Sequence, residues 1–256
     1  MQTDTRPLIL VTNDDGITAP GIRALVDAIK DLGQVVIIAP DSPQSGMGHA
    51  ITISKPLRVE RNDVFKGFES YQCSGTPVDC VKLGHHQVLD RLPDLVVSGI
   101  NHGSNASINI IYSGTMSAAV EAAVEGIPAV GFSLCDYAYH ADFEPCKPYI
   151  KSICKNILEK GLPDGVLLNV NFPKADEFKG LKVCRQARAK WKEDFDQRTD
   201  PNGREYYWLV GKFINMEPEA TDTDQAALDL GYVSVVPTQF DLTSHSSIDL
   251  LRDWKM

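Results

Sequence analysis

The 256-residue chain lacks long hydrophobic runs. Its longest apolar segments, such as residues 35–39, have the length of a strand, whereas a membrane-spanning helix needs about 20 residues. The N-terminal residues contain an acid and lead into only a short apolar run, so they do not resemble a signal peptide. We therefore expect a cytoplasmic protein that does not interact with membranes.

Basic residues and paired cysteines are also scarce. The 25 basic side chains are outnumbered by 34 acidic ones, which gives a formal charge of −9 and argues against a nucleic-acid duplex as the main partner. The six cysteines include no Cys-x-x-Cys pair, and this favours reduced, buried thiols over a zinc or redox motif. Because the rest of the composition is typical of a globular protein, small-molecule chemistry is the favoured class of function.

Several catalytic motifs are missing as well. The chain has no Gly-x-x-x-x-Gly-Lys-Ser/Thr, no Gly-x-Gly-x-x-Gly after its first predicted strand, no Gly-x-Ser-x-Gly and no His-Glu-x-x-His. These absences argue against a P-loop NTPase, a dinucleotide-dependent dehydrogenase, an α/β-hydrolase and a zincin. Asn13 stands where a haloacid-dehalogenase-type phosphatase would carry its aspartyl nucleophile, so water is the favoured nucleophile.

Residues 8 to about 170 alternate between strand-like and helix-like patterns. Residues 8–12 and 35–39 are continuous apolar runs, typical of parallel strands buried on both faces. The remaining pattern predicts strands over 95–98, 129–133 and 166–170, and helices over 22–29, 76–88, 116–125 and 147–159. This order predicts an α/β fold with a doubly wound, mostly parallel sheet.

The pattern changes after about residue 180. Residues 182–187 and 206–213 are expected to form a hairpin with a turn at Asp200-Pro-Asn-Gly203. A helix over 223–230 and a strand over 232–236 should follow. This region is either a second small domain or an arm that packs on a partner subunit.

Polar or glycine-rich segments follow three of the predicted strands: Asn13-Asp14-Asp15-Gly16, residues 40–49 and residues 99–105. In a doubly wound sheet, ligands bind beyond the carboxyl ends of the strands, so these segments should converge. The adjacent carboxylates of Asp14 and Asp15 repel each other, and a hard cation such as Mg²⁺ would relieve the repulsion. Ser113-Gly114-Thr115 opens a helix, whose free N–H groups attract a phosphate.

Each of these features also has a purely structural interpretation. The Asn13–Gly16 segment can be a turn that caps the next helix, and Ser113 or Thr115 can cap theirs. His49 and His102 can be structural or solvated rather than donors to a phosphate or a leaving group. The aromatic residues at 191 and 206–208 can form core or subunit contacts rather than stack on a nucleobase. The convergence of three strand ends favours the functional interpretation.

These segments resemble the SurE family of survival-protein nucleotidases. The matching blocks are residues 8–17 (LILVTNDDGI), 39–41 (APD), 45–49 (SGMGH), 74–81 (SGTPVDCV), 97–105 (VSGINHGSN), 112–119 (YSGTMSAA), 200–209 (DPNGREYYWL), 221–224 (TDTD) and 231–234 (GYVS). They run in order over nearly the whole chain, which makes the resemblance highly specific.

The resemblance implies a single SurE-like domain over residues 1–256. Its Rossmann-like core would span about residues 1–180, and a C-terminal hairpin and exchange arm over about 181–256 would join homodimers or homotetramers. The implied activity is that of a metal-dependent 5′-nucleotidase, with 3′-nucleotidase and exopolyphosphatase activity in some relatives. The family's ligands for one divalent ion per subunit, Mg²⁺ or Mn²⁺, correspond to Asp14, Asp15, Ser45 and Asn101.

We therefore expect hydrolysis of a nucleotide phosphomonoester by a metal-activated water, without a covalent intermediate. Asp14 and Asp15 would be catalytic, and the phosphate would be bound by Asn101, Asn105, Ser113, Gly114 and Thr115. Two other functions remain open. One is a non-catalytic nucleotide or phosphate sensor, which the carboxylate pair disfavours because it repels phosphate. The other is a phosphomonoesterase whose substrate is not a nucleotide.

Overall fold

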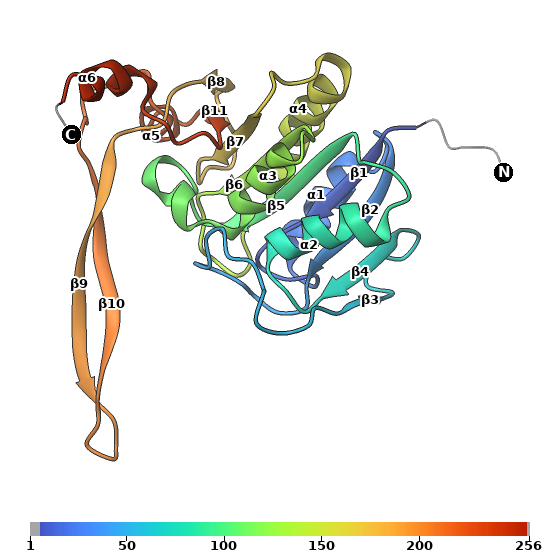
Figure 1. Cartoon of the computed structure of the whole chain (residues 1–256), viewed down its shortest axis with the longest axis horizontal. Coiled ribbons are helices and arrows are strands. Elements are labelled where there is room, and N and C mark those ends of the chain that lie inside the picture. The colour runs from blue at the N-terminus through green and yellow to red at the C-terminus, as the bar shows by residue number, and fades with distance from the viewer. Residues whose placement is uncertain (1–5, 255–256) are drawn as a thin grey trace.

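A nine-stranded sheet forms the centre of the molecule in the computed structural model, which describes residues 6–254 (Figure 1). Its strand order is β3-β4-β2-β1-β5-β6-β7-β11-β8. The central strands are parallel: β1 (Leu8–Thr12), β2 (Gln34–Pro40), β5 (Leu95–His102), β6 (Ala129–Leu134) and β7 (Val166–Phe172). Since β2 and β5 lie on opposite sides of β1, the sheet is doubly wound, and the predicted fold class is confirmed.

The two edges of the sheet contain shorter and more polar strands. At one edge, β3 (Val59–Arg61) pairs antiparallel with β4 (Glu69–Cys73). At the other edge, β11 (Val233–Gln239) runs antiparallel to β7, and β8 (Leu181–Val183) pairs parallel with β11. Neither β3 nor the adjoining β4 was predicted, because their short polar sequences lack the continuous apolar run of a strand that is buried on both faces.

Helices cover both faces of the sheet. One face packs against α1 (Pro20–Ile29) and α4 (Lys147–Lys160), and the opposite face against α2 (Pro77–Leu83) and α3 (Gly114–Val124). The predicted stripe of Ile22, Leu25, Val26 and Ile29 is buried in the first of these layers. The short helices α5 (Asp224–Asp229) and α6 (Ile248–Arg252) lie near the C-terminal end of the described chain.

The helix predicted over residues 76–88 is in fact two segments. It begins as expected, because the Thr76 hydroxyl accepts a hydrogen bond from the Asp79 N–H (3.2 Å) while the Asp79 carboxylate accepts one from the Thr76 N–H (2.9 Å). The α-helix ends at Leu83, and Gly84–Val88 then forms a wider π-helical turn. Gly84 lets this turn lie against the sheet, since a Cβ there would stand 3.0 Å from Ile38 Cδ1.

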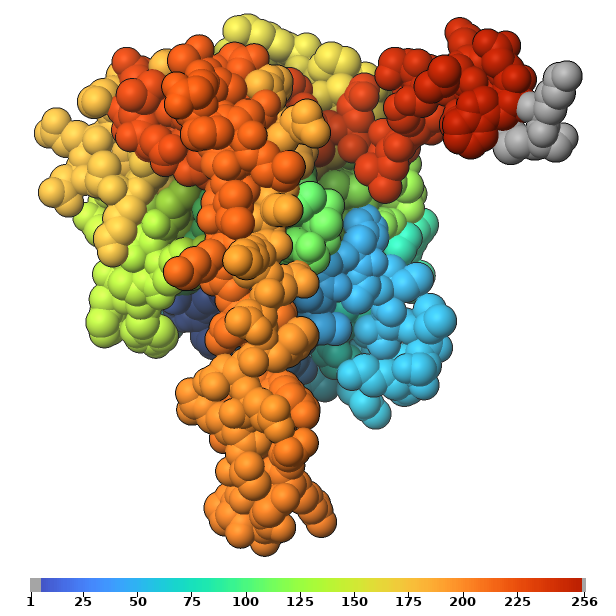
Figure 2. All heavy atoms as spheres, turned by 90° about the vertical axis from the view of Figure 1, so that its left-hand side faces the viewer, coloured from blue at the N-terminus to red at the C-terminus, as the bar shows by residue number. Residues whose placement is uncertain are grey.

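A long hairpin projects from the body of the molecule (Figure 1; Figure 2, orange). It consists of β9 (Ala189–Thr199) and β10 (Glu205–Asn215), with the predicted turn closed by a Gly203 N–H to Asp200 O hydrogen bond of 3.0 Å. The prediction that residues 182–187 form one of its strands is wrong, because residues 181–183 belong to β8 in the main sheet. The first hairpin strand was missed because its mostly charged sequence is exposed and lacks an apolar pattern.

None of the helices within residues 6–254 has the length and apolar character needed to cross a membrane.

Candidate active site

The three predicted strand ends converge on one cavity of about 300 Å³. Five of the predicted site residues line it: Asp14, Ser45, Asn101, Asn105 and Ser113. They meet because β2 and β5 flank β1 and run parallel to it, so all three strands end at the same edge of the sheet. The cavity also contains one histidine, His102, and the aromatic side chains of Tyr112, Tyr137 and Trp191.

Asp14 is a buried carboxylate held against the start of α3. Its Oδ1 accepts a hydrogen bond from the Thr115 hydroxyl at 2.5 Å. A Cβ at Gly114 would lie 2.8 Å from Asp14 Cβ, so only glycine allows the helix to approach this closely. Burial raises the pKa of the Asp14 carboxyl to about 6, and the charge of Asp15 adds to the effect, whereas the Thr115 hydroxyl opposes it. Keeping Asp14 ionised at neutral pH therefore lowers the stability of the folded protein, and a bound cation would offset this loss.

Asp15 lies beside Asp14 in a half-buried position and does not itself line the cavity. Its Oδ2 accepts a hydrogen bond of 3.4 Å from the backbone N–H of His102, which connects the end of β1 to the end of β5. Burial raises the pKa of Asp15, and His102 opposes that rise. Both adjacent carboxyls thus have a raised pKa, which is a common property of functional sites.

The remaining oxygen atoms of the predicted metal set come from Asn101 and Ser45. The Asn101 amide nitrogen donates to Gly103 O at 2.9 Å, which orients the side chain and leaves its carbonyl oxygen as an acceptor. Ser45 belongs to a loop attached to the site by a 2.7 Å hydrogen bond from the Gln44 N–H to Asp14 O. In addition, Asn13 Oδ1 is buried and has no hydrogen-bond partner within residues 6–254. Carboxylate, amide and hydroxyl oxygens are the ligands that a hard cation prefers.

Ser113 both caps α3 and lines the cavity. The Ser113 hydroxyl accepts a 3.0 Å hydrogen bond from the Met116 N–H, so the capping interpretation of Ser113 is correct. The Thr115 hydroxyl is directed to Asp14 and is fully buried. Ser113 nevertheless lines the cavity, so the positive end of the helix dipole lies next to it.

Asn105 is held by a buried polar network that was not predicted from the sequence. Its amide nitrogen donates to Ser133 Oγ (2.7 Å) and its backbone N–H to Asn171 Oδ1 (2.8 Å), while Asn169 Nδ2 donates to Asn105 O (2.9 Å). The network attaches the loop after β5 to β6 and β7. The available signal was the pair of asparagines in the otherwise apolar strand VLLNVNF, because a buried polar side chain requires a partner.

A second cavity of about 280 Å³ shares Ser104, Asn109, Tyr137 and Trp191 with the first. Trp191 lies at the root of the hairpin, and its indole N–H donates to Asn109 Oδ1 at 2.8 Å. Of the aromatic residues considered from the sequence, only Trp191 therefore lines these cavities. Tyr206, Tyr207 and Trp208 are exposed on the hairpin.

The two loop histidines have different surroundings. His49 does not line the cavity, and its Nε2 forms a 2.8 Å hydrogen bond with Glu121 Oε2. Lys82 pairs with the same carboxylate, and His49 and Lys82 together lower the pKa of Glu121. His102 lines the cavity, with its ring edge-on to Phe143 at a centroid distance of 5.0 Å.

The comparisons with known proteins agree with this geometry. The family model described as Survival protein SurE matches residues 9–193. The 5′-nucleotidase SurE of Christiangramia forsetii is 64% identical over 98% of this chain and 98% of its own length, and that of Bacteroides fragilis is 47% identical over 98% of both chains. The crystal structure of the SurE protein from Aquifex aeolicus has a TM-score of 0.82 and 39% identity, and the match covers 96% of this chain and 98% of that one. These matches span nearly the whole chain and confirm the resemblance found in the sequence: the chain belongs to the SurE family.

Proposed function

We propose that this protein is a metal-dependent 5′-nucleotidase that hydrolyses nucleoside 5′-monophosphates with water as the nucleophile. The observation that carries the proposal is the buried Asp14 carboxylate beside Asp15, at a strand end that opens into a cavity next to a helix N-terminus. The relatives named 5′-nucleotidase SurE support the same reaction class.

The residues at this strand end fit a divalent cation. They offer only oxygen ligands, and two carboxyls with raised pKa values lie near a buried asparagine oxygen without a partner in the described part of the chain. Asp14, Asp15, Ser45 and Asn101 would hold one Mg²⁺ or Mn²⁺ per subunit. Such an ion neutralises phosphate charge and lowers the pKa of a bound water.

The protein's own groups bind the phosphate and move the proton. The N-terminal end of α3, with the Gly114 N–H and the positive helix dipole, binds phosphate oxygens together with the side chain of Asn105. Asp14 or Asp15 accepts the proton of the attacking water. His102, the one imidazole in the cavity lining within the described residues, donates a hydrogen bond to the phosphate or to the leaving oxygen.

The nucleoside occupies the neighbouring cavity. Tyr137 and Trp191 line both cavities, so a ligand with its phosphate near Asp14 can extend along these two rings. An aromatic face can stack on any nucleobase, so it does not distinguish one base from another. The groups proposed to bind phosphate would recognise the phosphoryl group itself, so 3′-monophosphates and the terminal phosphate of short polyphosphates are further proposed substrates.

The hairpin is proposed as the contact between subunits of a homodimer or homotetramer. Phe195, Trp208 and Leu209 have exposed fractions of 62%, 59% and 64% on a ribbon that extends away from the body (Figure 2). Large apolar side chains at this exposure are typical of a surface that a partner covers.

Phosphate release from a panel of 5′- and 3′-nucleoside monophosphates, a short polyphosphate and a non-nucleotide phosphomonoester tests the proposal. The panel is run with Mg²⁺ or Mn²⁺ and again with excess chelator. We expect chelator-sensitive release, fastest with 5′-monophosphates. Nucleotide binding without release under any metal would support the sensor function instead, and faster release from the non-nucleotide ester would support a general phosphomonoesterase.

A further inference from the structure

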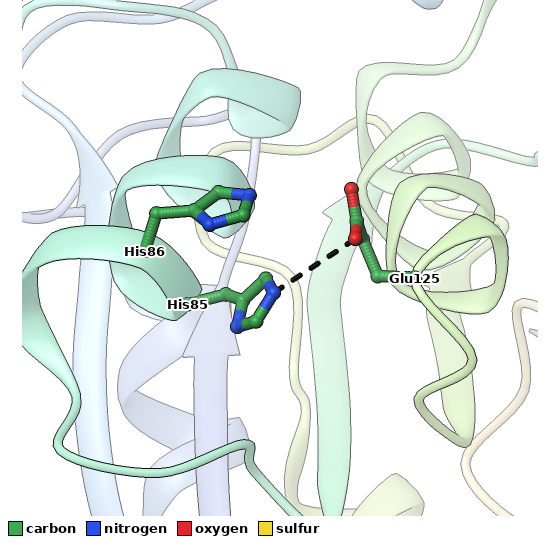
Figure 3. A group of neighbouring side chains, drawn as sticks. All are labelled: His85, His86 and Glu125. Atoms are coloured by element: carbon green, nitrogen blue, oxygen red, sulfur yellow. Dashed lines mark ion pairs between the residues drawn. The ribbon is translucent and has the colours of Figure 1, made fainter.

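His85, His86 and Glu125 form a cluster of metal-ligating side chains outside the active site (Figure 3). Within residues 6–254, this is the one group of at least three His, Cys, Asp or Glu side chains whose ligand atoms all lie within 4.8 Å of one another. His85 Nε2 is 3.8 Å from Glu125 Oε2. The three side chains therefore already point toward a common position.

The backbone explains why two consecutive histidines can face the same way. His85 and His86 lie in the π-helical turn Gly84–Val88, in which successive side chains diverge less than in an α-helix. Their rings lie 4.1 Å apart, tilted by 36°. His85 Nδ1 is buried with no hydrogen-bond partner in the described chain, while Nε2 of the same ring faces the Glu125 carboxylate. Turns of this type are frequent at functional sites.

The surroundings of Glu125 favour a cation. Glu125 follows the last residue of α3, where its carboxylate adds to the negative end of the helix dipole. Lys82 Nζ is 3.8 Å from Glu125 Oε1, but Lys82 forms its closer ion pair with Glu121. Glu125 can therefore turn toward a metal ion without leaving the Lys82 ammonium unpaired.

We propose that His85, His86 and Glu125 bind a borderline transition-metal cation of the Zn²⁺ class, at a second site separate from the active site. Two imidazole nitrogens and one carboxylate oxygen suit Zn²⁺, whereas Mg²⁺ prefers oxygen ligands alone. Metal bonds of about 2.0–2.1 Å place tetrahedral ligand atoms roughly 3.3 Å apart, so the site closes through side-chain shifts on the order of 1 Å. Water completes the coordination.

The second site lies at the opposite end of α3 from Asp14. The helix has 11 residues, which corresponds to about 16 Å at a rise of 1.5 Å per residue. A bound ion would join the π-helical turn to the C-terminal end of α3. Because neither site shares a ligand with the other, this proposal does not depend on the proposed nucleotidase function.

The test is a titration of the full-length protein with ZnCl₂ in excess Mg²⁺, which competes with Zn²⁺ for the oxygen-rich active site. Isothermal calorimetry measures the affinity and stoichiometry of the wild-type protein and of His85→Ala, His86→Ala and Glu125→Gln. His140→Ala is the matched control, since His140 is exposed and lies outside the cluster. The visible absorption of bound Co²⁺ and the melting temperature with and without Zn²⁺ are second readouts.

We expect one Zn²⁺ per chain in the wild-type protein and in the control, an increase in melting temperature on binding, and at least about a tenfold loss of affinity in each cluster variant. Three results would overturn the proposal: no Zn²⁺ binding, binding equal in all variants, or binding weakened as much by His140→Ala as by the cluster variants. The last of these would indicate adventitious binding to surface histidines.

Discussion

Replacing Asp14 with asparagine is expected to stabilise the metal-free protein while it abolishes activity. Burial raises the pKa of the Asp14 carboxyl from 3.8 to about 6. The folded protein then holds this proton more tightly than the unfolded chain, so stability is greatest below the unfolded pKa and is lost as the pH rises through about 6. Asparagine has nearly the same shape and no charge, so it removes this penalty.

The size of the effect follows from the shift in pKa. A rise of about two units at about 1.4 kcal/mol each corresponds to about 3 kcal/mol in the free energy of unfolding at pH 8, and to about half of that at pH 5. In a chain of this length, 1 kcal/mol changes the melting temperature by about 2–4 °C. In chelator at pH 8, Asp14→Asn should therefore melt roughly 6–12 °C above the wild-type protein.

Thermal melts at pH 5 and pH 8, in chelator and in saturating Mn²⁺, test this prediction. A cation that binds only the folded wild-type protein adds about 2.7 kcal/mol at a hundred times its Kd, so Mn²⁺ should narrow or close the gap. Asp164→Asn, at an exposed aspartate in the loop before β7, is the matched control. Two results would contradict this reasoning: Asp14→Asn melts at or below the wild-type temperature in chelator at pH 8, or its melting temperature rises as much at pH 5 as at pH 8. In either case ionised Asp14 does not destabilise the metal-free protein, and the proposed metal site loses its main support.

Four further changes test other parts of the proposed site. Thr115→Val removes the hydroxyl that donates to Asp14 and should lower Mn²⁺ affinity about 10–100-fold in activity titrations, with rescue by Thr115→Ser; an unchanged affinity would contradict the positioning role. Gly114→Ala introduces a Cβ 2.8 Å from Asp14 Cβ and should lower kcat/KM by about 100-fold, and wild-type kinetics would refute the close approach. Trp191→Ala should weaken nucleotide binding by about 1–3 kcal/mol but leave KM for a non-nucleotide ester nearly unchanged; equal effects on both substrates would argue against stacking. The double change Trp208→Glu and Leu209→Lys should shift the mass measured by light scattering toward the monomer, and an unchanged oligomer would exclude this part of the hairpin as the subunit contact.

The central part of the fold was predictable because burial on both faces leaves a local trace in the sequence. The strands around residues 8–12 and 35–39 are continuous apolar runs, and the structure places both in the interior of the sheet. Thr76 and Thr223 were recognisable as helix starts because a capping hydroxyl acts on an N–H only a few residues away. Such signals depend on neighbours in sequence and need no tertiary contact.

The features that escaped prediction depend on distant partners. The first hairpin strand, β9, is mostly charged and owes its form to pairing with β10. Residues 181–183 form a strand only because β11 provides an edge for them in the main sheet. Residues Gly84–Val88 have the sequence pattern of an ordinary helix. Their π-helical hydrogen bonds were not predictable locally, because Gly84 packs against Ile38 and Leu10 of the distant sheet.

The same division holds for the candidate site. The local sequence shows which strand ends carry oxygen-bearing and glycine residues, and so predicted Asp14, Ser45, Asn101, Asn105 and Ser113 at one edge of the sheet. Three contacts could be seen only in the folded chain: Thr115 donates to Asp14, Asn105 is held by Ser133 and Asn171, and Trp191 reaches the cavity from the hairpin root. The two kinds of information differ in the sequence distance over which the residues interact. A parallel sheet brings the ends of its strands together whatever their side chains are, whereas the partner of each buried polar group is chosen by packing among residues that are far apart in the chain.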